Sequence, residues 1–271
     1  MRFLRPLLLG FLVLLVGTAA FFYAKSPSHE RDWAPDQARL PSAEVAGDIA
    51  TISNVRDFTY RTAEEFDAIY DTRTYDLSKI ARTWYVVVPF GPPGVAHAFL
   101  SFEFDDGAYV SVSVEARREA GESYSPIKGA FRAYELMYVV GDERDVIGVR
   151  ANQRKHDVYL YPLALSREQS RTVFESMLRD INAIAEQPEF YNTFTGSCMT
   201  GVAKHLAAAG VRIPLSLEFL LPAYSDKLFY DLGLIKGEVA FDALKAASLI
   251  NERASALEID EDFSRAIRDQ K

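Results

Sequence analysis

The sequence contains a single cysteine among 271 residues. This excludes an internal disulfide framework and any zinc site built from several cysteines. An excess of positive charge is also missing, since 30 Lys and Arg face 38 Asp and Glu. A nucleic-acid-binding protein needs a basic face to displace counterions, so we expect no nucleic acid partner. The sequence has no phosphate-binding loop, dinucleotide fingerprint or His-Glu-x-x-His zinc motif, so we expect no metal and no organic cofactor.

Acidic residues are absent from the first 25 positions. Arg2 and Arg5 precede an uncharged apolar run from Pro6 to Ala24, long enough for about 28 Å of helix against a hydrocarbon core of about 30 Å. We expect residues 1–25 to form a signal anchor, a transmembrane helix that spans the inner membrane. The alternative is a signal peptide cleaved near residues 17–19, which would leave a secreted protein. Both interpretations export the remainder of the chain. The expected location is the bacterial inner membrane, single-pass, with the C-terminal domain in the periplasm.

The exported part divides into a short linker and one domain. Residues 26–45 hold three prolines and little periodicity, so we predict a linker. Residues 46–271 form the predicted periplasmic domain, and its strand-like patterns precede its helical ones. Strands are expected at 84–90, 96–104, 108–115, 134–140, 146–151 and 157–163, and helices from 166, at 198–209 and at 239–249. This order predicts an α+β fold with an antiparallel β-sheet packed on helices.

One predicted hairpin brings a histidine close to a glutamate. Residues 98, 100, 102 and 104 share an apolar face, as do 108, 110, 112 and 114, and both rows must lie on the same side of the sheet. A three-residue loop at 105–107 satisfies this by pairing Phe104 with Ala108, and its last position suits Gly107. The same register pairs His97 with Glu115 on the more polar face, within reach of a carboxylate–imidazole hydrogen bond. The plainer interpretation is a solvated histidine.

Cys198 lies at the start of a predicted helix, directly after Ser197, a good N-cap residue. The free N–H groups and the dipole of a first helical turn stabilise a thiolate, and they can also bind an oxyanion. The alternative is a small buried apolar side chain, the common role of a free cysteine. His205 is too far along the same helix to serve the thiol, at about 10.5 Å for seven residues. His97 is the best remaining base.

Three further residues are candidates for roles at the site. Glu103 shares the face of His97 and is a second candidate acid. Tyr191 and Asn192 precede Cys198 in a polar loop and are candidate substrate-binding or oxyanion-binding residues. The alternative for these last two is an ordinary structural turn.

Local strings across residues 50–267 resemble a bacterial family long described as a domain of unknown function, the Lnb N-terminal periplasmic domain. They are Asn54–Phe58, Ala96–Phe102, Ser113–Arg117, Asp142–Asp145 and Tyr191–Thr195. The family typically reads Asn-Cys-Thr-Thr, where this chain has Ser197-Cys198-Met199-Thr200. More distantly, the His, Glu, Cys order is similar to circularly permuted papain-like thiol hydrolases, which include lecithin–retinol acyltransferase.

The resemblance implies a permuted papain-like fold, with Cys198 as nucleophile, His97 as base and Glu115 as the residue that orients the imidazole. We expect a membrane-anchored periplasmic hydrolase or acyltransferase that acts on an amide, ester or thioester of the cell envelope. The competing hypothesis is a non-catalytic envelope binding or assembly module on the same fold. Either would take an envelope peptide, lipid or protein as its partner.

Overall fold

The computed structural model describes residues 25–237, 239–256 and 263–269, together with Gly10 and Gly17. Within these residues, no helix has the length and apolar character needed to cross a bilayer. The predicted transmembrane segment, residues 1–25, lies outside the described residues except for Gly10, Gly17 and Lys25.

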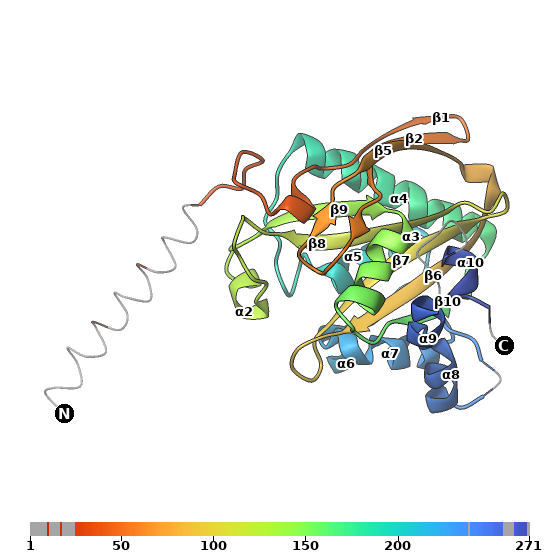
Figure 1. The fold of residues 1–271 in the computed structure, drawn as a ribbon. Helices are drawn as coiled ribbons and strands as arrows, with labels where there is room; N and C mark the ends of the chain where they lie inside the picture. The colour runs from red at the N-terminus through yellow and green to blue at the C-terminus, as the bar shows by residue number, and fades with distance from the viewer. Residues whose placement is uncertain (1–9, 11–16, 18–24, 238, 257–262, 270–271) are drawn as a thin grey trace, which may run out of the picture.

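An eight-stranded, mainly antiparallel sheet forms the centre of the fold (Figure 1). Its strand order is β1-β2-β9-β8-β7-β6-β10, and β5 also pairs with β2. The exception is the short parallel contact of β2 with β9. The strands are β1 (Ser42–Ala46), β2 (Ile49–Arg56), β5 (Tyr70–Asp76), β6 (Ile80–Pro89), β7 (Ala96–Phe104), β8 (Tyr109–Arg117), β9 (Glu135–Gly141) and β10 (Tyr159–Pro162), with a separate hairpin of β3 (Thr59–Tyr60) and β4 (Phe66–Asp67).

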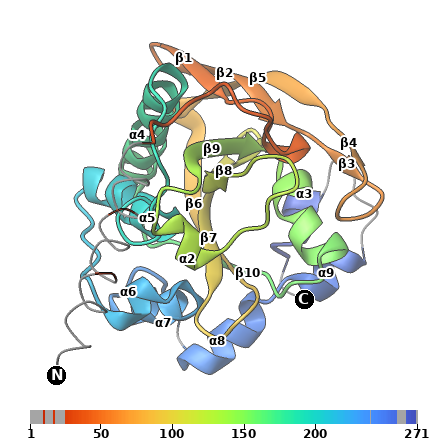
Figure 2. The same ribbon diagram turned by 90° about the vertical axis from the view of Figure 1, so that its left-hand side faces the viewer.

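Helices lie on both faces of this sheet (Figure 2). On one face, α4 (Arg167–Glu186) and α5 (Cys198–Ala208) bury the apolar rows of β7 and β8, which include Leu100, Phe102 and Val112. The opposite face is covered by α3 (Glu143–Val146), the π-helical η3 (Val149–Gln153), α9 (Asn251–Ser255) and α10 (Phe263–Ala266). The remaining short elements are η1 (Pro35–Gln37), η2 (Leu77–Lys79), α2 (Pro126–Gly129), α6 (Leu217–Leu220), η4 (Pro222–Tyr224), α7 (Ser225–Asp231) and α8 (Phe241–Ser248). The predicted α+β class is thereby confirmed.

The β7–β8 hairpin has the predicted register. Leu100 pairs with Val112 and Phe102 with Val110, and the Phe104 N–H donates to Ala108 O at 2.9 Å. Gly107 has a φ of +86°, which a residue with a Cβ would adopt only with strain. The more polar face of the hairpin, which carries His97 and Glu115, is covered by α3, η3 and the C-terminal helices. Ser113, on that face, is completely buried.

The N-cap predicted at Ser197 is present, and Ser166 caps α4 in the same way. Ser166 accepts from the Gln169 N–H, and the Gln169 side chain reaches back to the Ser166 N–H. Ser197 makes the equivalent capping box with Thr200, whose hydroxyl oxygen accepts from the Ser197 N–H at 2.6 Å. Cys198 therefore occupies the first turn of α5.

The predicted strand at 146–151 is wrong, because this segment is helical and belongs to α3 and η3. The Asp142 side chain caps α3 by accepting from the Arg144 N–H. Buried acidic side chains then fix the turn. Asp145 pairs with Arg56, and Glu143 pairs with Arg268. The apolar residues of the segment are buried against the sheet, and periodicity cannot distinguish a short apolar run in a buried helix from one in a buried strand.

The segment predicted as a linker, residues 26–45, packs against the domain. Ala34 and Gln37 are buried, and β1 begins at Ser42. The Gln37 side chain donates to Ala116 O at 3.1 Å and accepts from the Arg118 N–H at 2.7 Å. Few residues of this segment are apolar, so its hydrogen bonds to the end of β8 give no periodic signal in the sequence.

Candidate active site

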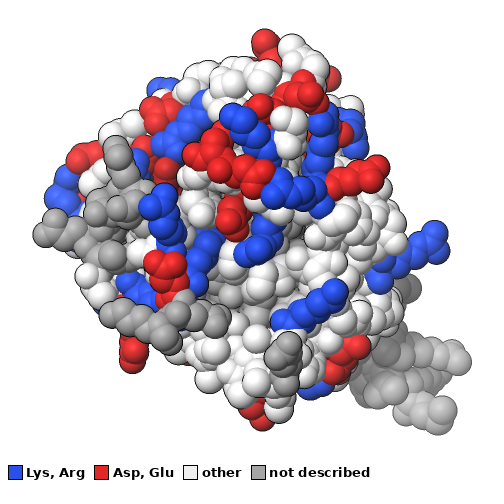
Figure 3. All heavy atoms as spheres, turned by 90° about the vertical axis from the view of Figure 1, so that its right-hand side faces the viewer, with Lys and Arg blue, Asp and Glu red and all other residues white. Residues whose placement is uncertain are grey.

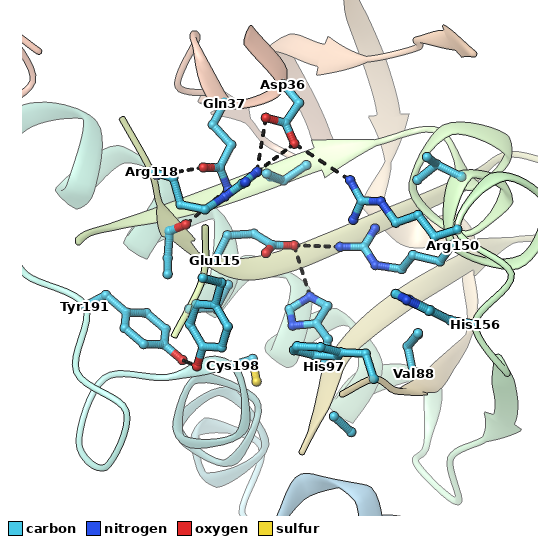
Figure 4. Close-up of a pocket in the computed structure, with 18 of the residues that line it drawn as sticks. Asp36, Gln37, Val88, His97, Glu115, Arg118, Arg150, His156, Tyr191 and Cys198 are labelled. Carbon is cyan, nitrogen blue, oxygen red and sulfur yellow. Dashed lines mark hydrogen bonds and ion pairs between the residues drawn. The ribbon is translucent and has the colours of Figure 1, made fainter. Parts of the chain in front are cut away.

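A cavity of about 220 Å³ contains the three residues predicted to carry the chemistry (Figure 4). His97 comes from the start of β7, Glu115 from the end of β8 and Cys198 from the first turn of α5. All three line this cavity. The structure therefore brings together a thiol, an imidazole and a carboxylate from three separate elements.

The imidazole of His97 is held through Nε2. This nitrogen lies 3.0 Å from Glu115 Oε1 and 2.6 Å from the Ser113 hydroxyl. The Ser113 hydroxyl donates to the same Glu115 oxygen at 2.8 Å. The ring also stacks on Phe99, with centroids 5.3 Å apart. Because Nε2 is engaged by Glu115 and Ser113, Nδ1 is the ring nitrogen that can exchange a proton with another group.

Charge interactions favour the protonated form of His97. Burial by itself would lower its pKa, but the Glu115 carboxylate and a hydrogen bond with Cys198 raise the pKa of His97 to about 9. Burial likewise opposes ionisation of Glu115, yet His97 and Arg150 hold the pKa of that carboxyl well below its usual value. The histidine and the glutamate therefore form a buried ion pair at neutral pH.

Arg150 completes this pair from the opposite side of Glu115. Its Nη2 donates to Glu115 Oε1 at 2.9 Å and its Nη1 to Val146 O at 2.6 Å. The guanidinium also lies over the Phe99 ring, 5.2 Å from the centroid. A carboxylate held by two cationic groups has little freedom to rotate away from the imidazole. Arg150 was not predicted as a site residue, because residues 146–151 were expected to form a strand.

Cys198 is 7% exposed and borders two cavities. The second cavity, of about 390 Å³, shares Ala96, Tyr124, Tyr191 and Cys198 with the first. Its other lining is largely apolar and includes Ile127, Phe194, Met199, Leu220, Leu221 and Pro222. Ile127 and Phe194 are 75% and 60% exposed. The thiol thus lies where a charged cavity meets an apolar groove.

Comparison with known families gives a match over residues 65–228, more than half of the chain, to the model of the Lnb N-terminal periplasmic domain. The chain belongs to this family. No curated protein and no solved structure gives a match. The family description supports a periplasmic location for this Lnb-type domain. The matched segment contains His97, Glu115 and Cys198, whereas η1 precedes it.

Of the three other predicted site residues, Tyr191 lines the cavities, whereas Asn192 and Glu103 do not. Tyr191 lines both cavities, and its hydroxyl lies 3.1 Å from that of Tyr124. Burial and the nearby Cys198 keep the pKa of Tyr191 far above its usual value, so it remains a neutral phenol. Asn192 lines neither cavity, and its side chain accepts from the Phe194 and Thr195 N–H groups in a turn. Glu103 also lies away, with its carboxylate accepting from Trp84 Nε1 at 2.8 Å.

Of two further histidines, His156 lines the cavity and His205 does not. His205 is fully buried away from the cavity, with Nε2 2.8 Å from the Tyr138 hydroxyl and Nδ1 3.0 Å from the Ser176 hydroxyl. Burial lowers the pKa of His205 to about 4. His156 lines the cavity and stacks on Phe90. Its pKa is lowered by burial and by the charges of Arg154 and Arg150.

The sequence analysis also missed the polar wall of the cavity, which consists of Asp36, Arg118 and Arg154. Figure 4 shows the Asp36 carboxylate between two guanidinium groups. It accepts from Arg118 Nη2 at 3.0 and 3.2 Å and lies 3.9 Å from Arg154 Nη2. The basic run Arg150–Lys155 beside His156 is the one local signal for this wall. Among the described residues, no cluster of His, Cys, Asp and Glu could hold a metal ion.

Proposed function

We propose that the domain is a Cys–His thiol hydrolase or acyltransferase that acts on an amide, ester or thioester in the cell envelope. The observation that carries the proposal is the buried Glu115–His97 pair at 3.0 Å beside a cysteine in the first turn of a helix. A thiol nucleophile next to a base that an acid orients corresponds to the arrangement of papain-like thiol enzymes. We extend the proposal to a permuted papain-like fold.

The first half-reaction follows from the three side chains. In the reactive state the proton of Cys198 Sγ–H resides on Nδ1 of His97, so a thiolate faces the imidazolium that Glu115 holds. The thiolate attacks the acyl carbon, and the oxyanion that forms accepts from the Cys198 and Met199 N–H groups, which have no acceptor within α5. The imidazolium then protonates the leaving amine, alcohol or thiol as its bond to the acyl carbon breaks. An acyl-Cys198 thioester remains.

The second half-reaction releases the acyl group. Water, or an acceptor amine or alcohol, attacks the thioester while His97 takes its proton, and Cys198 leaves as the thiol. Glu115 and Arg150 keep the ring in one orientation through both steps. The apolar groove beside Cys198 would receive an apolar part of the substrate. A membrane anchor at residues 1–25 would hold the domain next to the inner membrane.

The proposal is tested by trapping the acyl-enzyme. A p-nitrophenyl ester is added to the full chain, nitrophenol release is followed, and the intact mass is recorded before and after hydroxylamine. We expect a burst of nitrophenol and a hydroxylamine-sensitive acyl adduct, both lost in Cys198→Ala and reduced at least 100-fold in rate in His97→Ala, as for loss of a general base. Glu175→Gln, a change at a half-buried position on α4 that lines neither cavity, serves as a control for the preparation and should match the wild type.

The non-catalytic binding module gives the opposite outcome. It predicts no adduct on Cys198, and a cellular phenotype that survives Cys198→Ser. The Ser197 and Met199 that flank the thiol, where the family typically has Asn and Thr, are the feature that favours this alternative. Adduct formation at equal rates in the wild type and in His97→Ala would refute the Cys–His mechanism itself.

A further inference from the structure

The polar wall of the cavity carries more positive charge than its own acids balance. Four arginines line the cavity. Arg56 is neutralised by a two-bond contact with Asp145, which is fully buried. The other three, Arg118, Arg150 and Arg154, have only Asp36 and Glu115 as acidic partners on this wall, and Glu115 also binds His97. Together with the protonated His97, these three arginines face two carboxylates, so positive charge exceeds negative charge on this wall.

Arg154 is the side chain with the weakest pairing. Within the part of the chain that the structure describes, its one ion pair is the 3.9 Å contact to Asp36, whose carboxylate already binds Arg118. The Arg154 side chain is 33% exposed and lines the cavity. It follows Arg150 by one helical turn, so two guanidinium groups of like charge lie on the same side of η3. Like charges at this spacing repel unless an anion lies between or beside them.

The distribution of charged side chains differs between the cavity wall and the outer surface. On the face drawn in Figure 3, basic and acidic side chains are interspersed. On the cavity wall, burial lowers the pKa of His156, and the charges of Arg154 and Arg150 lower it further, against a smaller opposing effect of Asp157. Arg118 is held in place by its two contacts with Asp36, which gives the wall a fixed donor geometry.

We propose that Arg154 and Arg118, positioned by Asp36, form a subsite for a compact anionic group of the substrate, either a carboxylate or a phosphate ester. This inference rests on the proposed thiol chemistry, because the subsite lies in the same cavity as Cys198. Arginine suits both groups, since its planar donors bind two oxygens at once. Asp36 and Arg118 lie on the opposite side of Glu115 from Cys198 (Figure 4). The anion would bind there while the acyl carbon lies at the thiol.

The subsite is tested by the charge preference of alkylation at Cys198. Maleimides that end in a carboxylate are compared with the matching carboxamides, in a short and a long spacer version, on the full chain at constant ionic strength. We expect the carboxylate to react about tenfold faster for the spacer that reaches the wall, as one close charge interaction in a partly solvated site would give. This preference should fall below threefold in Arg154→Gln and in Arg118→Gln.

Arg167→Gln is the matched control, because Arg167 is exposed and pairs with Asp105 on the outer surface. It should retain the preference. Equal rates for carboxylate and carboxamide in the wild type, or a preference that survives in both cavity variants, would overturn the subsite. Failure of Cys198 to react with either reagent would instead count against the proposed thiol chemistry.

A second measurement does not depend on the thiol. The ring signals of His156 are followed by NMR while inorganic phosphate or acetate is added to the Cys198→Ala chain. A saturable shift that Arg154→Gln abolishes supports the subsite, and the anion that saturates first distinguishes a phosphate ester from a carboxylate. The absence of a saturable shift with either anion overturns it.

Discussion

The charge of Glu115 should determine the protonation state of His97. The pKa of His97 rises from 6.5 to about 9, and at about 1.4 kcal/mol per tenfold change this is about 3 kcal/mol in favour of the imidazolium. Two charges 3.0 Å apart attract by roughly 5 kcal/mol at an effective dielectric constant of about 20. This Coulomb attraction is larger than the free energy of the pKa shift, because burial disfavours the charged imidazolium. In Glu115→Gln the attraction is lost and burial remains, so the pKa of His97 should fall below 6.5.

The assay is an NMR titration of the imidazole signals, with His97 assigned by comparison with a His97→Gln chain. Glu103→Gln is the matched control, because the Glu103 carboxylate bonds to Trp84 and lies outside the cavity. It should leave the titration of His97 unchanged. A wild-type His97 that titrates near 6.5, or a midpoint near 9 that persists in Glu115→Gln, would refute the ion pair.

The same pair should affect stability in a defined pH window. The pKa of His97 in the folded state lies above its unfolded value, so its stabilisation is complete below about pH 6.5 and is lost as pH rises to about 9. The free energy of unfolding should fall by about 3 kcal/mol across this window, as measured by urea unfolding. This part of the pH dependence should disappear in Glu115→Gln.

Four further predictions concern the surroundings of the site. The pKa of His205 falls to about 4, so urea unfolding should show stability decreasing as pH drops from about 6.5, and His205→Gln should flatten this limb. Ser113→Ala should lower the pKa of His97 only slightly in the NMR titration, because Glu115 keeps its direct contact. Gly201→Ala should cost about 1–3 kcal/mol in urea unfolding, since its Cβ would lie 2.7 Å from Val114 Cγ2, whereas Gly196→Ala meets nothing closer than 3.5 Å. Tyr191→Phe should leave folding intact and change the rate of Cys198 alkylation less than twofold if the phenol only fills space.

Much of the fold could be predicted because its signals are local. The register of the β7–β8 hairpin follows from two apolar rows and from a glycine in the loop. The starts of α4 and α5 follow from the Ser166 and Ser197 capping boxes. Each of these depends on neighbours within a few residues, where side-chain periodicity and hydrogen-bonding capacity decide the conformation.

The helices α3 and η3 and the segment around Asp36 could not be predicted from local signals. Residues 146–151 are mostly apolar and read as a short buried strand. The helical turn that leads into them is held by ion pairs of Asp145 with Arg56 and of Glu143 with Arg268, far away in the sequence. Asp36 reaches the cavity by hydrogen bonds at the end of β8, from a segment without periodicity. Arg150 and the arginine wall were missed for the same reason, since long-range charge pairing has no spacing rule along the chain.

The close approach of α5 to β8 links the fold to the chemistry. His97 and Glu115 lie on two neighbouring strands, and the hairpin register alone brings them together. Cys198 belongs to a helix whose distance from that hairpin is set by packing, and Gly201, one turn along, is where the helix meets Val114, the residue before Glu115. A side chain at Gly201 would push the first turn away from β8. The packing of α5 against β8 therefore sets the distance between the thiol and the imidazole. The apolar rows of β7 and β8 fix only the hairpin register, and with it the positions of His97 and Glu115.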